Sequence, residues 1–319
     1  VGFVAKGKEL KGIKKVLYFW AMHLTRHFEY NKRYSPLMRL KLRIADKLIY
    51  SKWREALGGN LVYAVSGGAA LQPQIARTLG MAGIMNVEGY GLTETSPVIA
   101  VNNPATREMK IGTVGTVLEG FEVKIAEDGE ILCKGPGVMM GYYKAPEMTA
   151  EVIDEDGWFH TGDIGTFEEG KYLKITDRKK EMFKLSGGKY IAPQMIENKL
   201  KASELIDQAM VIGAGEKFAS ALIVPNFVLL HDWCAENHVH FENNQELVQI
   251  PEVVAKIQQE VILINKTMGL HEEIKRFRLV CDEWTPATGE LSPTLKLRRN
   301  VVAAKYKPII DEIYSVSRN

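Results

Sequence analysis

Four short motifs of this sequence combine glycine with aromatic, hydroxyl or charged side chains, which are the residue types that bind nucleotides. They cover residues 89–95, 157–163, 177–193 and 289–299. Glycine lets a backbone approach a ligand closely, a tyrosine ring offers a flat face to a base, and a carboxylate can hold Mg²⁺, which prefers oxygen ligands. Each motif alone is also compatible with an ordinary turn or a solvated charged face. Their meaning therefore depends on the elements that position them.

The first motif follows a segment whose pattern predicts an α/β layer. Residues 61–65 are a short apolar run typical of a buried strand, and a second run near 84–87 leads into the motif. Between them, Pro73 suits the first turn of a helix, where a proline is tolerated. Strand, helix and strand in this order predict a parallel sheet. Upstream, apolar residues recur at helical spacing, so residues 9–57 are predicted to be helical.

The second motif lies in a stretch of short strands, from about residue 111 to 176. The pair Asp128-Gly129 is a strong hairpin signal, and Glu169-Gly170 separates two further alternating runs. This stretch predicts a small β-barrel or sheet. We expect it to complete a first domain, residues 1–176, in which the α/β layer precedes it.

The chain from residue 177 to 319 carries the third and fourth motifs and predicts a small α+β domain. A helix is expected after Pro193, and an amphipathic helix over 251–266. The remaining elements are three strands and a terminal helix, at 209–212, 221–224, 277–281 and near 308–316. The expected fold class is thus α/β plus α+β.

Composition and charge exclude several classes of protein. The three cysteines lie far apart, so neither a disulfide framework nor a cysteine zinc site is expected, and a reducing cytoplasm is the simplest location. No apolar run approaches the ~20 residues that a membrane-spanning helix needs. Residues 1–59 contain 14 Lys or Arg against 4 Asp or Glu, which suits either a solvated helical face or peripheral contact with the inner face of a membrane. Nucleic-acid binding rests on this basic segment alone and is not expected.

Taken together and in this order, the four motifs resemble the adenylate-forming (AMP-binding) superfamily, which includes acyl-CoA synthetases, luciferases and peptide-synthetase adenylation domains. The resemblance runs from about residue 61 to 300. Residues 91–95 and 291–298 look most like long-chain fatty acyl-CoA synthetases. Many relatives have Ser-Gly-Lys at the catalytic lysine, where this sequence has Thr294-Leu295-Lys296. The lysine is therefore assigned by its position.

The resemblance implies a nucleotide site in the first domain. Tyr90 would stack on adenine, Thr93 would contact the α-phosphate, and Glu94 would hold Mg²⁺. Asp163 would bind the ribose hydroxyls, supported by Arg178. The remaining residues implied to line the nucleotide or acyl group lie in glycine-containing loops: Gly68, Ala69 and Gly91.

The resemblance also implies a mobile second domain. Asp177 would be the hinge, and Gly187 and Gly188 would line the path of the pantetheine thiol of CoA. Lys296 would stabilise charge on the acyl carboxylate and the α-phosphate during adenylation, acting with Thr93 and Glu94. A lysine fixed there would obstruct the later attack of the thiol, so a domain that swings about Asp177 resolves the conflict.

The implied activity is ATP-dependent fatty acid–CoA ligation, with fatty acid, ATP, Mg²⁺ and CoA as the partners. An incomplete first domain would expose apolar surface, so a homodimer is one expected form of assembly. The family's Ser/Thr/Gly-rich phosphate loop has no counterpart in residues 1–319, so we expect this chain to be a C-terminal portion of such an enzyme and inactive alone. Two alternatives stay open. One is an adenylation domain that loads a carrier protein, and the other is a non-catalytic nucleotide-binding module.

Overall fold

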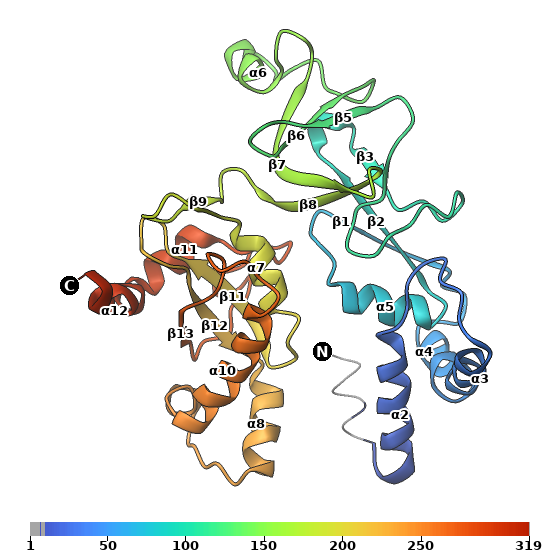
Figure 1. The fold of residues 1–319 in the computed structure, drawn as a ribbon, viewed down its shortest axis with the longest axis vertical. Coiled ribbons are helices and arrows are strands. Elements are labelled where there is room, and N and C mark those ends of the chain that lie inside the picture. The colour runs from blue at the N-terminus through green and yellow to red at the C-terminus, as the bar shows by residue number, and fades with distance from the viewer. Residues whose placement is uncertain (1–6, 8–9, 319) are drawn as a thin grey trace. The chain divides into compact units, whose positions relative to one another are not determined.

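The computed structural model describes Gly7 and residues 10–318, and the chain falls into two compact units, Val1–Lys179 and Lys180–Asn319. Figure 1 shows the elements of each unit. Residue 9, the expected start of the helical segment, and residues 1–6 of the basic segment lie outside the described residues. In the part of the chain that is described, no helix combines the length and apolar character needed to cross a bilayer.

The N-terminal segment is helical, but in separate pieces rather than continuously. The pieces are α2 (Gly12–Thr25), α3 (Pro36–Ala45), a π-helical turn η1 (Asp46–Tyr50) and α4 (Ser51–Ala56). The prediction of helix over 9–57 was wrong for residues 26–35, where the chain turns and Asn31 has a left-handed backbone with φ 62°. Ser35 begins the next helix, because its Oγ accepts the N–H of Met38 at 3.3 Å and Pro36 follows it.

The first sheet has four strands in the order β1-β2-β3-β4. Its strands are β1 (Tyr63–Gly67), β2 (Met85–Gly91), β3 (Val98–Val101) and β4 (Thr116–Val117). Helix α5 (Pro73–Met81) connects β1 and β2, with Pro73 at its start as expected. The predicted parallel pairing holds for β1 and β2, but β3 and β4 join antiparallel, so the sheet is mixed.

The second sheet is antiparallel, in the order β5-β6-β7-β8, which is the sheet alternative of the prediction. Its strands are β5 (Glu122–Ile125), β6 (Glu130–Lys134), β7 (Phe159–Glu168) and β8 (Tyr172–Arg178). Both predicted hairpins are present, at Asp128-Gly129 and at Glu169-Gly170. Two backbone hydrogen bonds tie this sheet to the segment before β4, from Val114 N to Leu173 O and from Leu173 N to Gly115 O, each 2.8 Å long.

The second unit is an α+β fold around a three-stranded mixed sheet in the order β11-β12-β13. The strands are β11 (Ile206–Ile212), β12 (Ser220–Pro225) and β13 (Arg276–Leu279), with a separate hairpin of β9 (Phe183–Lys184) and β10 (Tyr190–Ile191). The helices are α7 (Pro193–Leu200), α8 (Phe227–Glu236), α9 (Asn244–Leu247), α10 (Pro251–Asn265), α11 (Arg299–Lys305) and α12 (Lys307–Arg318). Helices α8, α9 and α11 and the hairpin of β9 and β10 were not predicted. Every residue of β12 is buried, so this strand forms the centre of the core.

Helix α10 packs on that core through one face and leaves the other in water. Ile257 is fully buried, as are Val253 and Val261, whereas Ile262 on the same helix is 47% exposed. Replacing Ile257 by alanine should lower the free energy of unfolding by about 2–5 kcal/mol, because the deletion leaves a cavity. The matched change Ile262→Ala should alter it by less than about 0.5 kcal/mol. Urea unfolding followed by circular dichroism measures both, and equal losses would contradict this packing.

A buried carboxyl on β2 makes stability depend on pH. Burial raises the pKa of Glu88 to about 7, against the opposing backbone hydrogen bond from Leu71. Between pH 4.5 and 7 the folded chain therefore binds more protons than the unfolded chain, so the free energy of unfolding falls as pH rises through this range. Glu88→Gln should remove this decline and be more stable than the parent by roughly 3 kcal/mol above pH 7. The exposed Glu122→Gln serves as the control, and parallel pH profiles for parent and Glu88→Gln would refute the assignment.

Candidate active site

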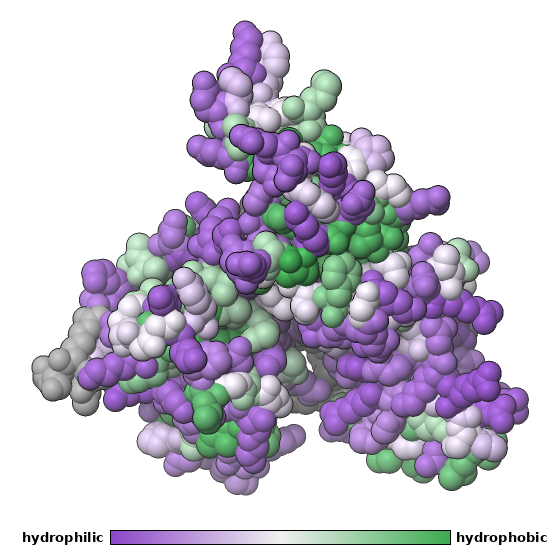
Figure 2. Space-filling model, turned by 45° about the horizontal axis from the view of Figure 1, so that its top comes forward, coloured by the Kyte–Doolittle hydropathy of each residue, from purple (hydrophilic) through white to green (hydrophobic). Residues whose placement is uncertain are grey.

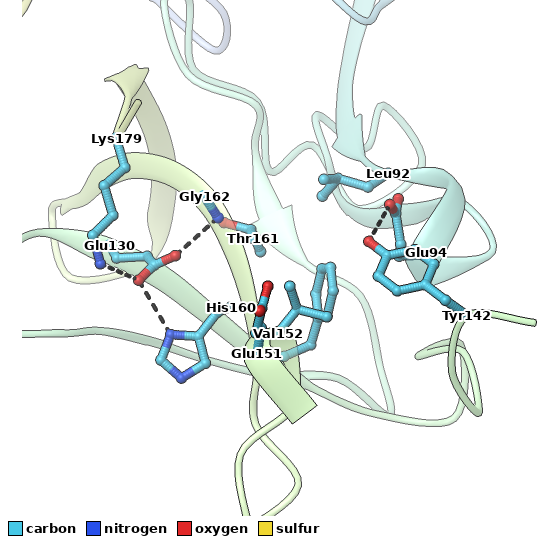
Figure 3. Close-up of a pocket in the computed structure, with 11 residues that line it drawn as sticks. Leu92, Glu94, Glu130, Tyr142, Glu151, Val152, His160, Thr161, Gly162 and Lys179 are labelled. Atoms are coloured by element: carbon cyan, nitrogen blue, oxygen red, sulfur yellow. Dashed lines mark hydrogen bonds and ion pairs between the residues drawn. The ribbon is translucent and has the colours of Figure 1, made fainter. Parts of the chain in front are cut away.

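A cavity of about 310 Å³ opens in the first unit, beside β6, β7 and the short helix η2 (Thr93–Thr95). Figure 3 shows Glu94 and Tyr142 on one side and Glu130, His160 and Lys179 on the other. The first motif supplies Glu94, and the second supplies His160 with the backbone of Gly162. The third motif supplies Lys179, so three of the four sequence motifs meet at one cavity.

The carboxylate of Asp163 on β7 is bound by side chains from two other strands, Tyr90 of β2 and Arg178 of β8. The Tyr90 hydroxyl donates to Asp163 Oδ2 at 2.8 Å, and Arg178 Nε lies 3.4 Å from Asp163 Oδ1. Asp163 and Arg178 are direct partners in the β7–β8 register. Burial and, next, the Asp163 carboxylate raise the pKa of Tyr90, so its hydroxyl stays protonated as a donor.

Glu94 faces the cavity from η2, and Tyr142 holds it there. The Tyr142 hydroxyl donates to Glu94 Oε1 at 3.0 Å. Burial and then Glu94 raise the pKa of Tyr142. Sequence reasoning missed Tyr142, because the pair is 48 residues apart and the tyrosine follows a glycine in a turn. Thr93, next to Glu94, is exposed.

The carboxylate of Glu94 fits a Mg²⁺ ion that is shared with substrate phosphates. No group of three or more His, Cys, Asp or Glu that could hold a metal occurs among the described residues. Mg²⁺ is often held by one or two carboxylates together with substrate phosphates and water. Glu94, with its carboxylate directed at the cavity, matches that arrangement rather than a protein cage.

The glycine loops of the first unit lie at the same sheet edge as Tyr90. Parallel pairing sets Gly67 opposite Gly89, so Gly68 and Ala69 leave β1 where Tyr90 leaves the paired part of β2. Gly91 has a steric reason to be glycine, since a Cβ there would lie 1.7 Å from the carbonyl oxygen of Pro97.

Glu130 is a functional candidate that sequence reasoning missed. Its carboxylate is almost fully buried and takes three partners: Lys179 Nζ at 2.8 Å, His160 Nδ1 at 3.2 Å and the backbone N–H of Gly162 at 2.9 Å. Burial opposes its ionisation, but these partners hold the pKa of Glu130 below its ordinary value. A glutamate within an apolar strand run was the available signal. By fixing Gly162, Glu130 orients the residue next to Asp163.

Asp177, the expected hinge, lies within β8. It is 1% exposed, pairs with Ile164 and accepts the N–H of Arg178 at 2.6 Å through Oδ1. The backbone N–H of Lys179 donates to Gly162 O at 2.8 Å, and the side chain of Lys179 binds Asp128 as well as Glu130. The first unit therefore ends at Lys179 rather than at Asp177.

The second unit displays the expected lysine and glycines on two tight turns. Gly187 and Gly188 form the turn between β9 and β10, where Gly188 has φ 83°. Lys296 lies in a hairpin closed by the bridge between Leu291 and Leu297. Its backbone is fixed on both sides by Ser292, and its side chain is exposed.

Two family models match this chain in succession. The model of the AMP-binding enzyme family matches residues 18–143, and that of the AMP-binding enzyme C-terminal domain matches residues 180–318. The long-chain-fatty-acid–CoA ligase FadD15 of Mycobacterium bovis is 40% identical over 280 residues, which are 88% of this chain and 46% of the relative. Long-chain-fatty-acid–CoA ligase 6 of Rattus norvegicus is 35% identical over 289 residues, covering 86% and 41%. The chain thus spans about half the length of the curated relatives it matches.

Solved structures confirm the predicted fold class. The adenylation domain of a carboxylate reductase from Mycobacterium chelonae has a TM-score of 0.67 and 23% identity, covering 94% of this chain and 45% of that one. The adenylation domain of a carboxylic acid reductase from Segniliparus rugosus, solved with AMP and a carboxylic acid, has a TM-score of 0.66 and 24% identity, covering 94% and 46%. With both family models matched in order along most of the sequence, the chain belongs to the adenylate-forming superfamily of AMP-binding enzymes.

Proposed function

We propose that this chain carries the nucleotide-binding residues and the mobile lysine of an ATP-dependent long-chain fatty acid–CoA ligase. The observation that carries the proposal is that Tyr90 and Arg178 both bind the carboxylate of Asp163. Gly162, the residue before Asp163, lines the cavity that Glu94 also lines. The names of relatives that are 35–40% identical over most of this chain support the choice of acid and thiol.

The proposed first step joins the fatty acid carboxylate to the α-phosphate of ATP and releases pyrophosphate. Tyr90 presents a ring to adenine, with Gly68, Ala69 and Gly91 in the adjoining loops, while Asp163 and Arg178 hold the ribose. Thr93 donates to the α-phosphate. Mg²⁺, held by Glu94, would offset the charge of the phosphates. Lys296 brings a cation to the oxygens on which negative charge develops, which stabilises the transition state.

The proposed second step is attack of the CoA thiol on the acyl-adenylate, which releases AMP. The turn of Gly187 and Gly188 leaves space for an extended pantetheine, since an added Cβ at Gly187 would have nothing within 4 Å. Lys296 has no part in this step, so its unit must be able to move away. Because Asp177 is buried in β8 and Lys179 is held by Asp128 and Glu130, the pivot is proposed to follow Lys179, with Asp177 as its anchor.

Lys296→Ala in the enzyme that contains this chain should slow acyl-adenylate formation by at least ~10²-fold, because a cation is lost where charge develops. Thioester formation from supplied acyl-adenylate should be unchanged. Pyrophosphate release and acyl-CoA formation are measured separately, with the exposed Lys266→Ala as the control. Equal loss in both half-reactions would refute the role of Lys296. Turnover with a carrier-protein thiol in preference to CoA would favour the alternative, an adenylation domain that loads a carrier protein.

We also propose peripheral membrane contact, through a ridge on α3 and η1. Four apolar side chains are exposed there at helical spacing: Leu37, Leu40, Ile44 and Leu48. Basic residues flank the ridge: Arg39, Lys41, Arg43 and Lys47. Within residues 36–50 the one acidic residue, Asp46, pairs with Arg54 at 2.7 Å. Figure 2 shows apolar surface next to hydrophilic surface over these helices. An apolar ridge between cations is complementary to an anionic lipid surface.

Sedimentation with vesicles tests the ridge. The chain should bind vesicles that contain anionic phosphatidylglycerol more strongly than neutral ones, and high salt should weaken the binding. Leu40→Gln with Ile44→Gln should lower binding at least fivefold, whereas the more exposed pair Leu263→Gln and Leu270→Gln in the second unit should not. Equal effects of both pairs would contradict the ridge.

We further propose that the chain forms a homodimer. Sedimentation equilibrium without lipid tests this, because a dimer should have twice the 35.8 kDa mass of the single chain.

A further inference from the structure

One arginine of the second unit joins three parts of the chain. Arg299 begins α11, and its guanidinium binds Glu197 through two parallel bonds, Nη1 to Oε1 at 2.8 Å and Nη2 to Oε2 at 2.6 Å. Arg299 Nε donates to Glu181 Oε2 at 2.9 Å. Glu197 is itself buried on α7 and accepts the N–H of Val211 on β11 at 2.7 Å. The guanidinium is therefore fixed in position by the core of the unit.

Two of the three parts are the segment that follows the unit boundary and the hairpin that carries Lys296. Glu181 is the second residue after Lys179, where the first unit ends. Its Oε2 also accepts a hydrogen bond from Gln194 at 2.7 Å. Lys296 precedes Arg299 by three residues. The segment by which the second unit is attached and the segment that presents the lysine thus meet on one side chain.

The opposite end of the Lys296 hairpin is also fixed. Glu290 is 1% exposed, and its Oε1 accepts from Lys305 Nζ at 2.8 Å. Its backbone oxygen accepts the N–H of Arg298 at 2.8 Å. The hairpin base is therefore held by Glu290 on one strand and Arg299 after the other. The side chain of Lys296 is exposed, so the position of this lysine is set by the base of its hairpin.

We propose that Arg299 is a positioning residue for Lys296, coupling the segment after the unit boundary to the lysine hairpin so that the two move as one body. The inference rests on the proposed function, because accurate placement of Lys296 matters only if this lysine acts in adenylation. A misplacement of 1 Å at a reacting group can cost ~10²-fold in rate. A buried ion pair such as Arg299–Glu197 is by itself weak evidence for a stabilising role. A positioning role explains better why the same guanidinium also binds Glu181.

The test uses Arg299→Lys in the enzyme that contains this chain. Lysine keeps a charge near Glu197 but cannot reproduce the parallel bonds or reach Glu181 at the same time. We expect the rate constant of acyl-adenylate formation to fall at least tenfold, with KM for ATP and the thioester half-reaction within twofold of the parent. The control is Arg278→Lys, whose arginine pairs with Glu312 at 2.9 Å in the same unit.

A second variant and a second measurement keep the outcome decisive. Glu181→Gln leaves the buried Arg299–Glu197 pair intact, so it should fold, and it should slow adenylation about threefold. Hydrogen exchange of the amides of residues 292–297 should rise in Arg299→Lys and not in Arg278→Lys, independently of activity. Equal slowing of both half-reactions, or unchanged exchange and adenylation, overturns the inference. If Lys296→Ala leaves adenylation intact, the proposed function fails instead, whatever Arg299→Lys does.

Discussion

A carboxylate removed from water must find hydrogen-bond donors, and two buried carboxylates of the first unit and one of the second find theirs on separate elements. Asp163 joins Tyr90 of β2 to Arg178 of β8. Glu130 of β6 joins Lys179 to the backbone of β7. Glu197 of α7 joins Arg299 to β11. Because each carboxylate binds donors from at least two other elements, each constrains the relative placement of several elements at once.

These constraints leave accessible the two side chains that are proposed to act on the nucleotide. Glu94 lines a cavity, and Lys296 is exposed on a hairpin whose base is held. Each is held by a neighbouring group. The Tyr142 hydroxyl donates to the carboxylate of Glu94, and Ser292 accepts the backbone N–H of Lys296. A group that must meet a polyphosphate cannot use all its bonding capacity on the protein. The division between buried supports and accessible side chains is what the proposed roles of Glu94 and Lys296 would require.

Local patterns in the sequence were sufficient where one short segment determines its own structure. The Asp128-Gly129 turn, Pro73 at the start of α5 and the strand leading into Tyr90 are all present as predicted. Long-range partners were not predictable, because they depend on strand register and tertiary packing. The Tyr142–Glu94 and Arg299–Glu197 pairs are separated by 48 and 102 residues. The break at residues 26–35 was missed for a different reason, since helical spacing on both sides concealed a turn that a left-handed Asn31 makes.

The supports on either side of the unit boundary restrict what the joint between the units can do. Lys179 is tied to Asp128 and Glu130 in the first unit, and Glu181 is tied to Arg299 and Gln194 in the second. Lys180 is the one residue between them. A joint of one residue has two soft backbone dihedrals, φ and ψ, whereas a flexible linker has many. Rotation there would follow a restricted path, and the proposed role of Lys296 requires such a path, because the lysine must return to the same position each time.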